Sequence, residues 1–204
     1  MDSTLSPSVA VVDSGVANLA SVVAALRRLD VEACVTADPA AIKQASRVIL
    51  PGVGAAAAAM SRLKEKSLPD VLRTLTQPVL GICLGMQLLF EKSAESNGTP
   101  CLGLLEGGVE RIPATPAHPV PHMGWNQLAF TRPDHPLLRG VQEGSYVYFV
   151  HSFAAPCGPL TVATASYGAD FTAIAAKGNF MGCQFHPERS GAVGSLILRN
   201  FLEM

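Results

Sequence analysis

The sequence has no excess of charge of either sign. Its 204 residues include 15 Lys and Arg against 16 Asp and Glu, which gives a formal net charge of −1 at pH 7. Proteins that bind nucleic acid or other polyanions by charge carry a basic field, and this composition offers none. We therefore expect no nucleic-acid partner, which leaves small molecules and protein surfaces.

Long apolar runs and a basic N-terminal segment are also missing. The longest uncharged apolar stretch, residues 48–60, is interrupted by Pro51, Gly52 and Gly54, and residues 1–8 carry an acid but no base. Such stretches are too short and too broken to cross a bilayer, and a secretory signal begins with basic residues. We expect neither a membrane anchor nor an export signal, and we expect residues 1–8 to form a flexible tail.

Paired cysteines are absent as well. The five cysteines are odd in number and show no C-x-x-C spacing, whereas zinc sites and disulfide frameworks need paired thiols. We expect no metal, no cofactor and a reducing, cytoplasmic environment. The five are Cys34, Cys83, Cys101, Cys157 and Cys183.

The sequence does contain an alternation of strand and helix patterns that is typical of an α/β domain. With 49% hydrophobic content, no internal repeat and no linker, the chain suits a single domain that spans residues 1–204. The alternation predicts a central, mostly parallel sheet flanked by helices, with ligands bound at the carboxyl ends of its strands. The expected strands are 9–12, 32–36, 47–50 and 78–82, and the expected helices are 19–29, a short one from residue 39, 55–66 and 85–92.

The second half of the chain has a different character. Residues 93–121 are rich in glycine and proline, which predicts a loop around one short strand at 109–112. The segments that follow are rich in β-formers and predict an additional β-rich C-terminal part that ends in a helix. The expected strands are 126–130, 145–151, 160–166, 171–176 and 180–186, and the closing helix is 192–202.

Cys83 lies where the strand expected at 78–82 meets the following helix. A nucleophile on such a sharp turn needs small residues two positions to either side, and Gly81 and Gly85 supply them. A thiol at a helix N-terminus is also favoured as the thiolate. Because a lone cysteine is more often a small buried hydrophobe, the hypothesis that Cys83 is a nucleophile depends on a base elsewhere in the chain.

A candidate base follows at the end of the last expected strand, in the run His186-Pro187-Glu188. Proline holds the preceding histidine extended, and residues i and i+2 of an extended segment point the same way. We therefore expect the Glu188 carboxylate to reach and orient the His186 ring. A surface loop would account for these three residues alone, but together with Cys83 they supply a nucleophile, a base and an orienting acid.

These motifs resemble those of the triad class (class I) of glutamine amidotransferases. The resemblance covers nearly the whole chain and implies a flavodoxin-like α/β domain that uses Cys83, His186 and Glu188 to release ammonia from L-glutamine. Within that class the chain is similar to the glutaminase subunits of imidazole glycerol phosphate synthases in histidine biosynthesis, and Met86 supports this choice. The segments that carry this likeness are 13–18, 51–54, 121–126 and 148–153.

The resemblance implies further roles around the nucleophile. The Leu84 N–H and an N–H from the loop Gly52-Val53-Gly54 would bind the oxyanion of the tetrahedral intermediates, since glycines leave a peptide free to reorient. The residues that would recognise glutamine are Gln87, Glu95, His151 and Ser152.

The resemblance also implies a heterodimer. A cyclase (synthase) subunit would receive the ammonia and make imidazole glycerol phosphate and an aminoimidazole carboxamide ribotide. Its docking face would surround the mouth of the crevice, with Asn18, Trp125, Tyr148 and Arg189 as candidate contacts. Trp125 is the only tryptophan of the chain, and tryptophan is common at the anchors of interfaces.

Three other functions stay open on the sequence alone. A stand-alone cysteine hydrolase of the peptidase or deglycase kind would use the same elbow, but it would not need the late His-Pro-Glu run. A binding domain that has lost catalysis would not need the intact set of three residues. The nearest alternative is the glutaminase of another pathway, such as pyridoxal phosphate synthesis, and the native partner would separate the two.

Overall fold

The computed structural model describes residues 8–15 and 18–204. The flexible tail predicted for residues 1–8 lies outside the described residues, except for Ser8. The N–H groups of Ser46 and Arg47 donate to the Ser8 carbonyl over 3.0 and 3.2 Å. The tail prediction is therefore wrong for Ser8, because the chain is already paired there with the segment that leads into strand β3 (Arg47–Gly52).

Eight strands form the central sheet, in the order β2-β1-β3-β4-β14-β13-β12-β9. Five of them are parallel, namely β2 (Ala33–Thr36), β1 (Val9–Val12), β3, β4 (Val79–Cys83) and β14 (Phe180–Cys183). The other three pair antiparallel, namely β13 (Asp170–Lys177), β12 (Thr161–Ser166) and β9 (Ala129–Phe130). The predicted mostly parallel sheet is confirmed. Because β14 is paired with β4, the chain that follows β14 reaches the same edge as Cys83.

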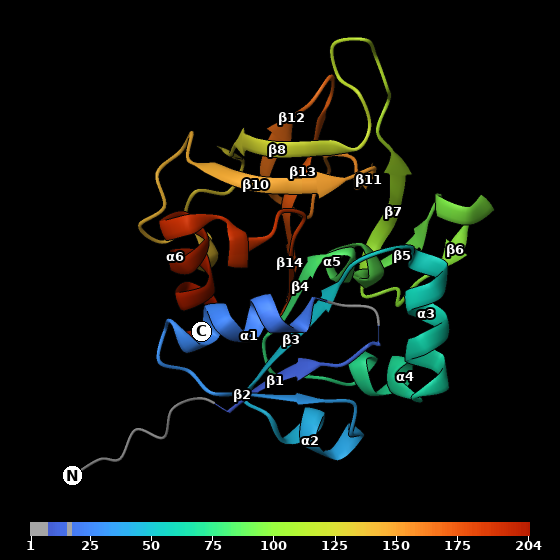
Figure 1. The fold of residues 1–204 in the computed structure, drawn as a ribbon, viewed down its shortest axis with the longest axis vertical. Coiled ribbons are helices and arrows are strands. Elements are labelled where there is room, and N and C mark those ends of the chain that lie inside the picture. Colours follow the sequence, from blue (N-terminus) through green and yellow to red (C-terminus); the bar gives the residue numbers. More distant parts are fainter. Residues whose placement is uncertain (1–7, 16–17) are drawn as a thin grey trace.

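Helices cover both faces of the parallel half of this sheet (Figure 1). Strand alternation explains the two layers, since Val9 and Val11 belong to one apolar cluster and Ala10 and Val12 to the other. The first cluster includes residues of α1 (Leu19–Arg27) and α6 (Gly191–Leu202), and the second those of α2 (Pro39–Gln44), α3 (Ala56–Glu65), α4 (Leu68–Arg73) and α5 (Leu84–Leu89). No helix of the described residues is long and apolar enough to span a membrane.

Two smaller sheets complete the fold, at the top and right of Figure 1. Strands β8 (His122–Gln127) and β10 (Tyr146–His151) form an antiparallel pair, here called the β8–β10 ribbon. The other sheet contains β11 (Phe153–Ala154), β7 (Leu105–Arg111), β5 (Phe90–Ser93) and β6 (Thr99–Pro100). Short 3₁₀ turns lie at η1 (Glu95–Asn97), η2 (Pro136–Leu138) and η3 (Pro187–Arg189).

Several boundaries differ from the sequence prediction. The helix predicted for 85–92 ends at Leu89, because the chain turns extended and forms β5 beside β7. The loop predicted for 93–121 contains β6 and β7, since two adjacent glycines in β7 hide its alternation. The strand predicted for 126–130 is divided between β8 and β9, and the one predicted for 180–186 ends at Cys183. Helix α4 was not predicted, because it is short and lacks the side-chain cap that Asp38 gives to the equally short α2.

Candidate active site

Cys83 lies on a strained turn between β4 and α5. Its backbone angles, φ 53° and ψ −113°, lie in a region that residues other than glycine rarely adopt. Backbone packs against backbone here: a Cβ atom on Gly85 would lie 1.7 Å from the Leu50 carbonyl oxygen, and one on Gly81 would lie 2.6 Å from the Met86 nitrogen. The predicted need for small residues on both sides of the cysteine is confirmed.

His186 and Glu188 form a buried hydrogen-bonded pair. His186 Nδ1–H donates to Glu188 Oε1 over 2.8 Å, and the two side chains are only 7% and 2% exposed. The contact is the predicted one, but its backbone cause is different, because only His186 is extended and the 3₁₀ turn η3 folds the carboxylate back onto the ring. The bond fixes Nδ1 as the donor nitrogen and leaves Nε2 for chemistry.

Hydrogen bonds of the backbone hold His186 against strand β10. The His186 N–H donates to the Tyr148 carbonyl over 2.9 Å. Ser190 closes a ring, because its hydroxyl accepts from the Tyr148 N–H over 2.9 Å and donates to the His186 carbonyl over 2.7 Å. Both backbone polar groups of His186 are therefore tied to the segment around the β8–β10 ribbon.

Opposing effects set the charge of His186. Burial is the largest effect and lowers the pKa of the imidazole, but Cys83 and Glu188 both raise it, and the net pKa is about 10. The ring is then protonated at neutral pH, so Nε2 carries a hydrogen that it can donate. Among the described residues Nε2 has no hydrogen-bond partner, so it is available to a molecule in the site.

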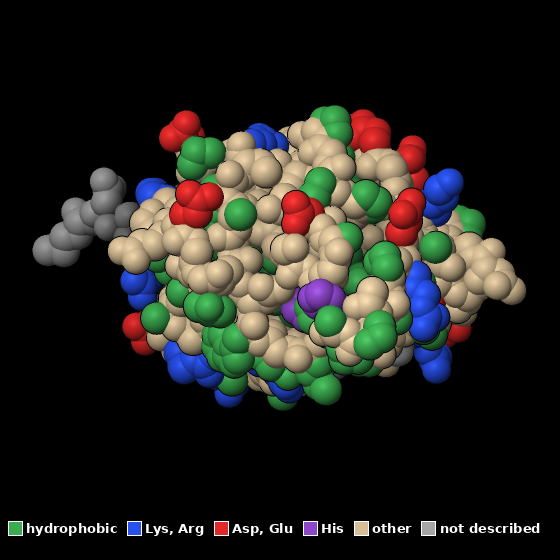
Figure 2. Space-filling model, turned by 90° about the horizontal axis from the view of Figure 1, so that it is seen from above, with side chains coloured by type: hydrophobic (Ala, Val, Ile, Leu, Met, Phe, Trp, Pro, Cys, Tyr) green, Lys and Arg blue, Asp and Glu red, His purple; other side chains and the backbone are tan. Residues whose placement is uncertain are grey.

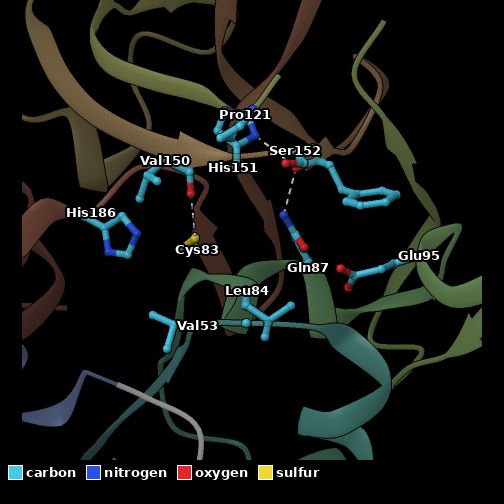
Figure 3. Close-up of a pocket in the computed structure, with 12 residues that line it drawn as sticks. Val53, Cys83, Leu84, Gln87, Glu95, Pro121, Val150, His151, Ser152 and His186 are labelled. Atoms are coloured by element: carbon cyan, nitrogen blue, oxygen red, sulfur yellow. Dashed lines mark hydrogen bonds between the residues drawn. The ribbon is translucent and has the colours of Figure 1, made fainter. Parts of the chain in front are cut away.

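The Cys83 sulfur has one acceptor and one donor close to it. The Val150 carbonyl oxygen and Gln184 Nε2 each lie 3.8 Å from Sγ. Figure 3 shows the Val150 contact, with the His186 ring on the same side of the pocket. A thiol can donate to the Val150 oxygen, whereas a thiolate can only accept, and Gln184 offers it a donor.

A cavity of about 280 Å³ opens in front of Cys83 and His186 (Figure 3). Glu188 does not line this cavity but lies behind His186, and Gly52 does not line it either. A Cβ atom on Gly52 would lie 2.9 Å from the Gly85 nitrogen, so this glycine is needed for packing. The predicted site residues that line the cavity are Val53, Cys83, Leu84, Gln87, Glu95, His151, Ser152 and His186.

Gln87 and Glu95 present acceptor oxygens on one wall of the cavity. Gln87 Nε2 donates to the Phe153 carbonyl over 2.8 Å and to Gln184 Oε1 over 3.0 Å, so both of its hydrogens are used and Oε1 remains. Glu95 Oε2 accepts from the Ala56 N–H over 2.6 Å at the start of α3, a helix without a side-chain cap of its own. Figure 3 shows the two side chains next to each other.

His151, which lines the cavity, forms a second buried pair with His122, which does not line it. His122 Nδ1 and His151 Nε2 are 2.9 Å apart, and His151 Nδ1 lies 2.9 Å from the Phe153 carbonyl. Since a carbonyl only accepts, His151 carries its proton on Nδ1, and His122 donates to it from Nδ1. Burial lowers the pKa of both rings to about 4, so both are neutral at neutral pH. The His151 ring is thus already occupied, and its backbone is what remains for a ligand.

The four residues predicted to contact a partner lie in three places. Trp125 and Tyr148 are cross-strand neighbours in the β8–β10 ribbon, with ring centroids 5.9 Å apart. Asn18 is the N-cap of α1, and Arg189 is exposed in η3. Their surroundings are compatible with a surface role, since none of the four is buried.

The outer face of the β8–β10 ribbon is strongly apolar. Met123 is 65% exposed, and Trp125 and Tyr146 are each 55% exposed. Strand alternation places these side chains outside while His122 and Phe149 are buried on the inner face. In the view from above, apolar side chains gather in the lower half and acidic ones mostly in the upper half (Figure 2). Exposed apolar side chains that gather on one face are typical of a protein-binding surface.

Gln184, Ser190 and His122 contact residues of the site although the sequence predicted no role for them, even for His122 in the segment 121–126. Gln184 has one usable signal, because it is a polar residue inside the apolar run from Phe180 to Phe185, and a buried polar side chain needs a partner. Ser190 and His122 have no comparable signal, since their partners are distant in the sequence.

The chain is closely similar to a group of curated proteins. Residues 10–204 match the family described as glutamine amidotransferase class-I. The imidazole glycerol phosphate synthase subunit HisH of Shewanella loihica is 51% identical over 207 residues, which covers 97% of this chain and 91% of that protein. The protein of the same name from Escherichia coli (strain K12) is 48% identical over 197 residues, which covers 97% of this chain and 100% of that protein.

Solved structures share the fold at much lower identity. One described as a glutamine amidotransferase has a TM-score of 0.73 at 20% identity, over 96% of this chain and 97% of that chain. A chain of the PurLQS structure from Thermotoga maritima has a TM-score of 0.72 at 19% identity, over 98% of this chain and 99% of that chain. These two show the fold alone. The family match over residues 10–204 and the relatives at about half identity establish more: the chain belongs to the class I glutamine amidotransferases, in the group of the imidazole glycerol phosphate synthase subunits HisH.

Proposed function

We propose that the chain hydrolyses L-glutamine to glutamate and ammonia at Cys83, as the glutaminase subunit of an imidazole glycerol phosphate synthase in histidine biosynthesis. The main support is a single cavity that holds an elbow cysteine together with a histidine whose Nδ1 is joined to Glu188 over 2.8 Å. The assignment to this synthase is supported by the names of the relatives at about half identity.

The reaction uses the two sides of the His186 ring differently. The Cys83 thiolate attacks the side-chain amide carbon of glutamine, and His186 Nε2–H protonates the departing ammonia. The thioester that remains is attacked by water, from which the now neutral Nε2 takes a proton. Glu188 holds the other nitrogen and stabilises the imidazolium form.

Two backbone N–H groups bind the oxyanion of the tetrahedral intermediates. The first is that of Leu84, the residue directly after the nucleophile, at the start of α5. The second is that of Val53, which lines the cavity. The Val53 N–H belongs to the peptide between Gly52 and Val53, so this peptide has to turn to present the donor, and Gly54 on the other side of Val53 has φ +88° and open space where a Cβ would be. Gly52 assists by its close packing on Gly85.

Glutamine is recognised through its α-substituents. The free Gln87 oxygen and the Glu95 carboxylate accept hydrogen bonds from the α-ammonium group, and the backbone of His151 and Ser152 binds the α-carboxylate. An alkyl amide that lacks these groups leaves buried polar partners unpaired, which carries a large penalty for so small a ligand. Simple alkyl amides are therefore poor substrates.

The decisive experiment is Cys83→Ala in the complex with the synthase partner. Because Cys83 acts only in generating ammonia, the variant loses synthesis from glutamine but keeps synthesis from added ammonium salt. The unmodified complex is the control for both reactions. Equal loss of the two activities would refute the assignment of Cys83.

The ammonia passes to a cyclase (synthase) subunit, with which the chain forms a heterodimer in the cytoplasm. The apolar outer face of the β8–β10 ribbon supports a docking face at Trp125 and Tyr148, to which Asn18 and Arg189 add polar contacts. All five cysteines are free thiols, in agreement with a reducing compartment.

Docking also switches the glutaminase on. The peptide between Gly52 and Val53 is the two-state element, and a partner loaded with its own substrate favours the orientation in which the Val53 N–H donates to the oxyanion. The test compares steady-state glutamine hydrolysis by the isolated chain, by the complex and by the complex with its acceptor ligand. Equal rates in all three would refute the switch. Trp125→Ala is expected to uncouple the ligand from glutamine hydrolysis without abolishing the basal rate.

A further inference from the structure

Gln184 is a fully buried carboxamide with a different partner at each end. It directly follows β14 and is 0% exposed. Its Nε2 lies 3.8 Å from Cys83 Sγ, and its Oε1 accepts from Gln87 Nε2 over 3.0 Å. Burial of a carboxamide costs free energy unless both ends are paired, so packing alone does not account for this side chain.

The direction of the Gln184 amide is determined by a carbonyl on another element. The Phe153 carbonyl can only accept, so the end of Gln87 that lies 2.8 Å from it is the NH₂ group. The second hydrogen of that group points to Gln184, whose facing atom must be the oxygen. The NH₂ end of Gln184 is therefore turned to the sulfur, and the hydrogen-bond network leaves no choice between the two ends.

A donor in this position changes the balance between the protonation states of Cys83. The thiol can give its hydrogen to the Val150 carbonyl, whereas the thiolate has no hydrogen for that oxygen. The Gln184 N–H stabilises the charged sulfur more than the neutral one, because hydrogen bonds to charged groups are stronger. This donor is uncharged, so its effect does not depend on the proton of His186.

We propose that Gln184 is a positioning residue of the glutaminase site, whose amide holds the Cys83 sulfur as a thiolate turned from the Val150 carbonyl toward the cavity. The inference rests on the proposed function, in which Cys83 is the nucleophile. Since the other end of Gln184 binds Gln87, the same amide joins the nucleophile to a side chain that recognises glutamine.

The test is the pH dependence of Cys83 alkylation by iodoacetamide in the full chain. The thiolate displaces iodide as the carbon–sulfur bond forms, so the rate follows the thiolate fraction. Cys34 and Cys157 are exposed and react too, so the rate is followed on the Cys83 peptide by mass spectrometry. Gln184→Met removes the amide with little change in volume. We expect alkylation at neutral pH to fall about tenfold and the midpoint of the profile to move about one pH unit higher.

Two further variants separate positioning from packing. Gln184→Leu also removes the amide and has neither a donor nor a charge near the sulfur, so its midpoint is also raised. Asn200→Leu is the matched control, because it removes another buried carboxamide, one that donates to the Leu137 and Arg139 carbonyls far from Cys83 in the sequence. It lowers the melting temperature but leaves the midpoint unchanged.

If the pH profile of Cys83 alkylation has the same midpoint in Gln184→Met as in the parent chain, the proposal is overturned, whatever the melting temperature of the variant. If Gln184→Met does not fold, Gln184→Leu decides by the same measurement. The proposed function is tested separately in the complex with the synthase partner, where prior alkylation of Cys83 in the unmodified chain should abolish glutamine hydrolysis. Hydrolysis that survives complete alkylation would refute the role of Cys83, and it would do so even if the amide does shift the profile.

Discussion

The candidate nucleophile and the candidate base are positioned by different physical means. Cys83 is positioned by direct contact between backbones, because α5 approaches β3 and β4 so closely that Gly81 and Gly85 have no room for a Cβ atom. Such contacts depend on the absence of a side chain and tolerate no added volume. One added methyl group should therefore displace the whole of α5 from β3 and β4.

His186 is positioned by hydrogen bonds. Tyr148 and Ser190 hold its backbone, and Glu188 holds its ring. Each of these bonds can be removed by one substitution while the others remain, so the base side can be weakened in steps. Mutations on the two sides should therefore have different outcomes. Those that crowd the backbone around Cys83 should unfold the chain, whereas those that remove a hydrogen bond around His186 should lower its function in steps.

Gly85→Ala should have the largest effect. The new methyl group would lie 1.7 Å from the Leu50 carbonyl oxygen, so α5 must move away from β3. We expect the free energy of unfolding to fall by more than about 3 kcal/mol, a large part of the stability of a typical domain. Chemical denaturation measures the change. Gly158→Ala is the matched control, because nothing lies within 4 Å of its Cβ position, and equal stability of the two variants would contradict the steric account.

His186→Ala and Glu188→Gln should differ in their effect on catalysis. In the proposed reaction His186 transfers protons, so its removal should lower kcat for glutamine hydrolysis by about 10³-fold. In the same reaction Glu188 only orients the ring, so Glu188→Gln should lower kcat by about 10- to 100-fold. Steady-state kinetics with melting curves of each variant separates catalysis from stability. An undiminished rate in Glu188→Gln would remove Glu188 from the site.

Ser190→Ala should weaken the base side without unfolding it. The change leaves the buried Tyr148 N–H and the His186 carbonyl without their hydroxyl partner. We expect a loss of about 1–3 kcal/mol in the free energy of unfolding and a drop in glutamine hydrolysis of about tenfold or less. Ser61→Ala removes an exposed hydroxyl of α3 and should change neither. A Ser190→Ala chain as stable and as active as the parent would show that the ring of hydrogen bonds does not position His186.

The smallest effect should come from the neutral histidine pair. The pKa of His122 and of His151 is about 4 in the folded chain, against 6.5 for an ordinary histidine. The unfolded chain therefore binds more protons between these values, and stability falls as the pH is lowered from about 6.5 to about 4. His186 does not add to this loss, because its pKa is raised and its contribution is lost only as the pH rises toward about 10.

His122→Gln checks this prediction. Glutamine cannot titrate, so the variant should lose less stability than the parent between about pH 7 and about pH 5, although it is less stable at the higher pH because ring stacking on Phe149 and Tyr167 is lost. Urea unfolding at the two pH values measures both quantities. An identical pH dependence in the two chains would show that His122 is not neutral in the fold.

The sequence predicts the turn at Cys83 well because its signals are local. The apolar strand, the flanking glycines and the following helix all lie within residues 78–89, and their order alone indicates a tight turn at Cys83. His186 and Glu188 are likewise only two residues apart. Local propensity and spacing were sufficient for these residues, and for the parallel half of the sheet.

The rest of the site could not be predicted because its contacts join distant parts of the chain. Gln184 meets Cys83 across 101 residues, and Ser190 meets Tyr148 across 42. The hydrophobic periodicity of a sequence predicts local elements and does not predict which distant residues form such pairs. In β8, Gly124 interrupts the pattern of β-forming residues, so the strand was predicted to begin at residue 126 instead of His122. The glycine has φ +141° in the structure. The polar network around the cavity is therefore apparent only in the folded structure.

The backbone conformation of Cys83 has a consequence for how this family can lose its activity. At φ 53° and ψ −113° a glycine has no steric strain, whereas a cysteine is strained by its Cβ atom. Relief of strain is worth about 1–3 kcal/mol, more than the roughly 0.5–1 kcal/mol by which glycine favours the unfolded chain. A gene copy no longer selected for ammonia release would thus gain robustness from Cys83→Gly while its core stayed intact. Inactive descendants of such a domain should be found with glycine at this turn, and the cysteine persists only where its chemistry is under selection.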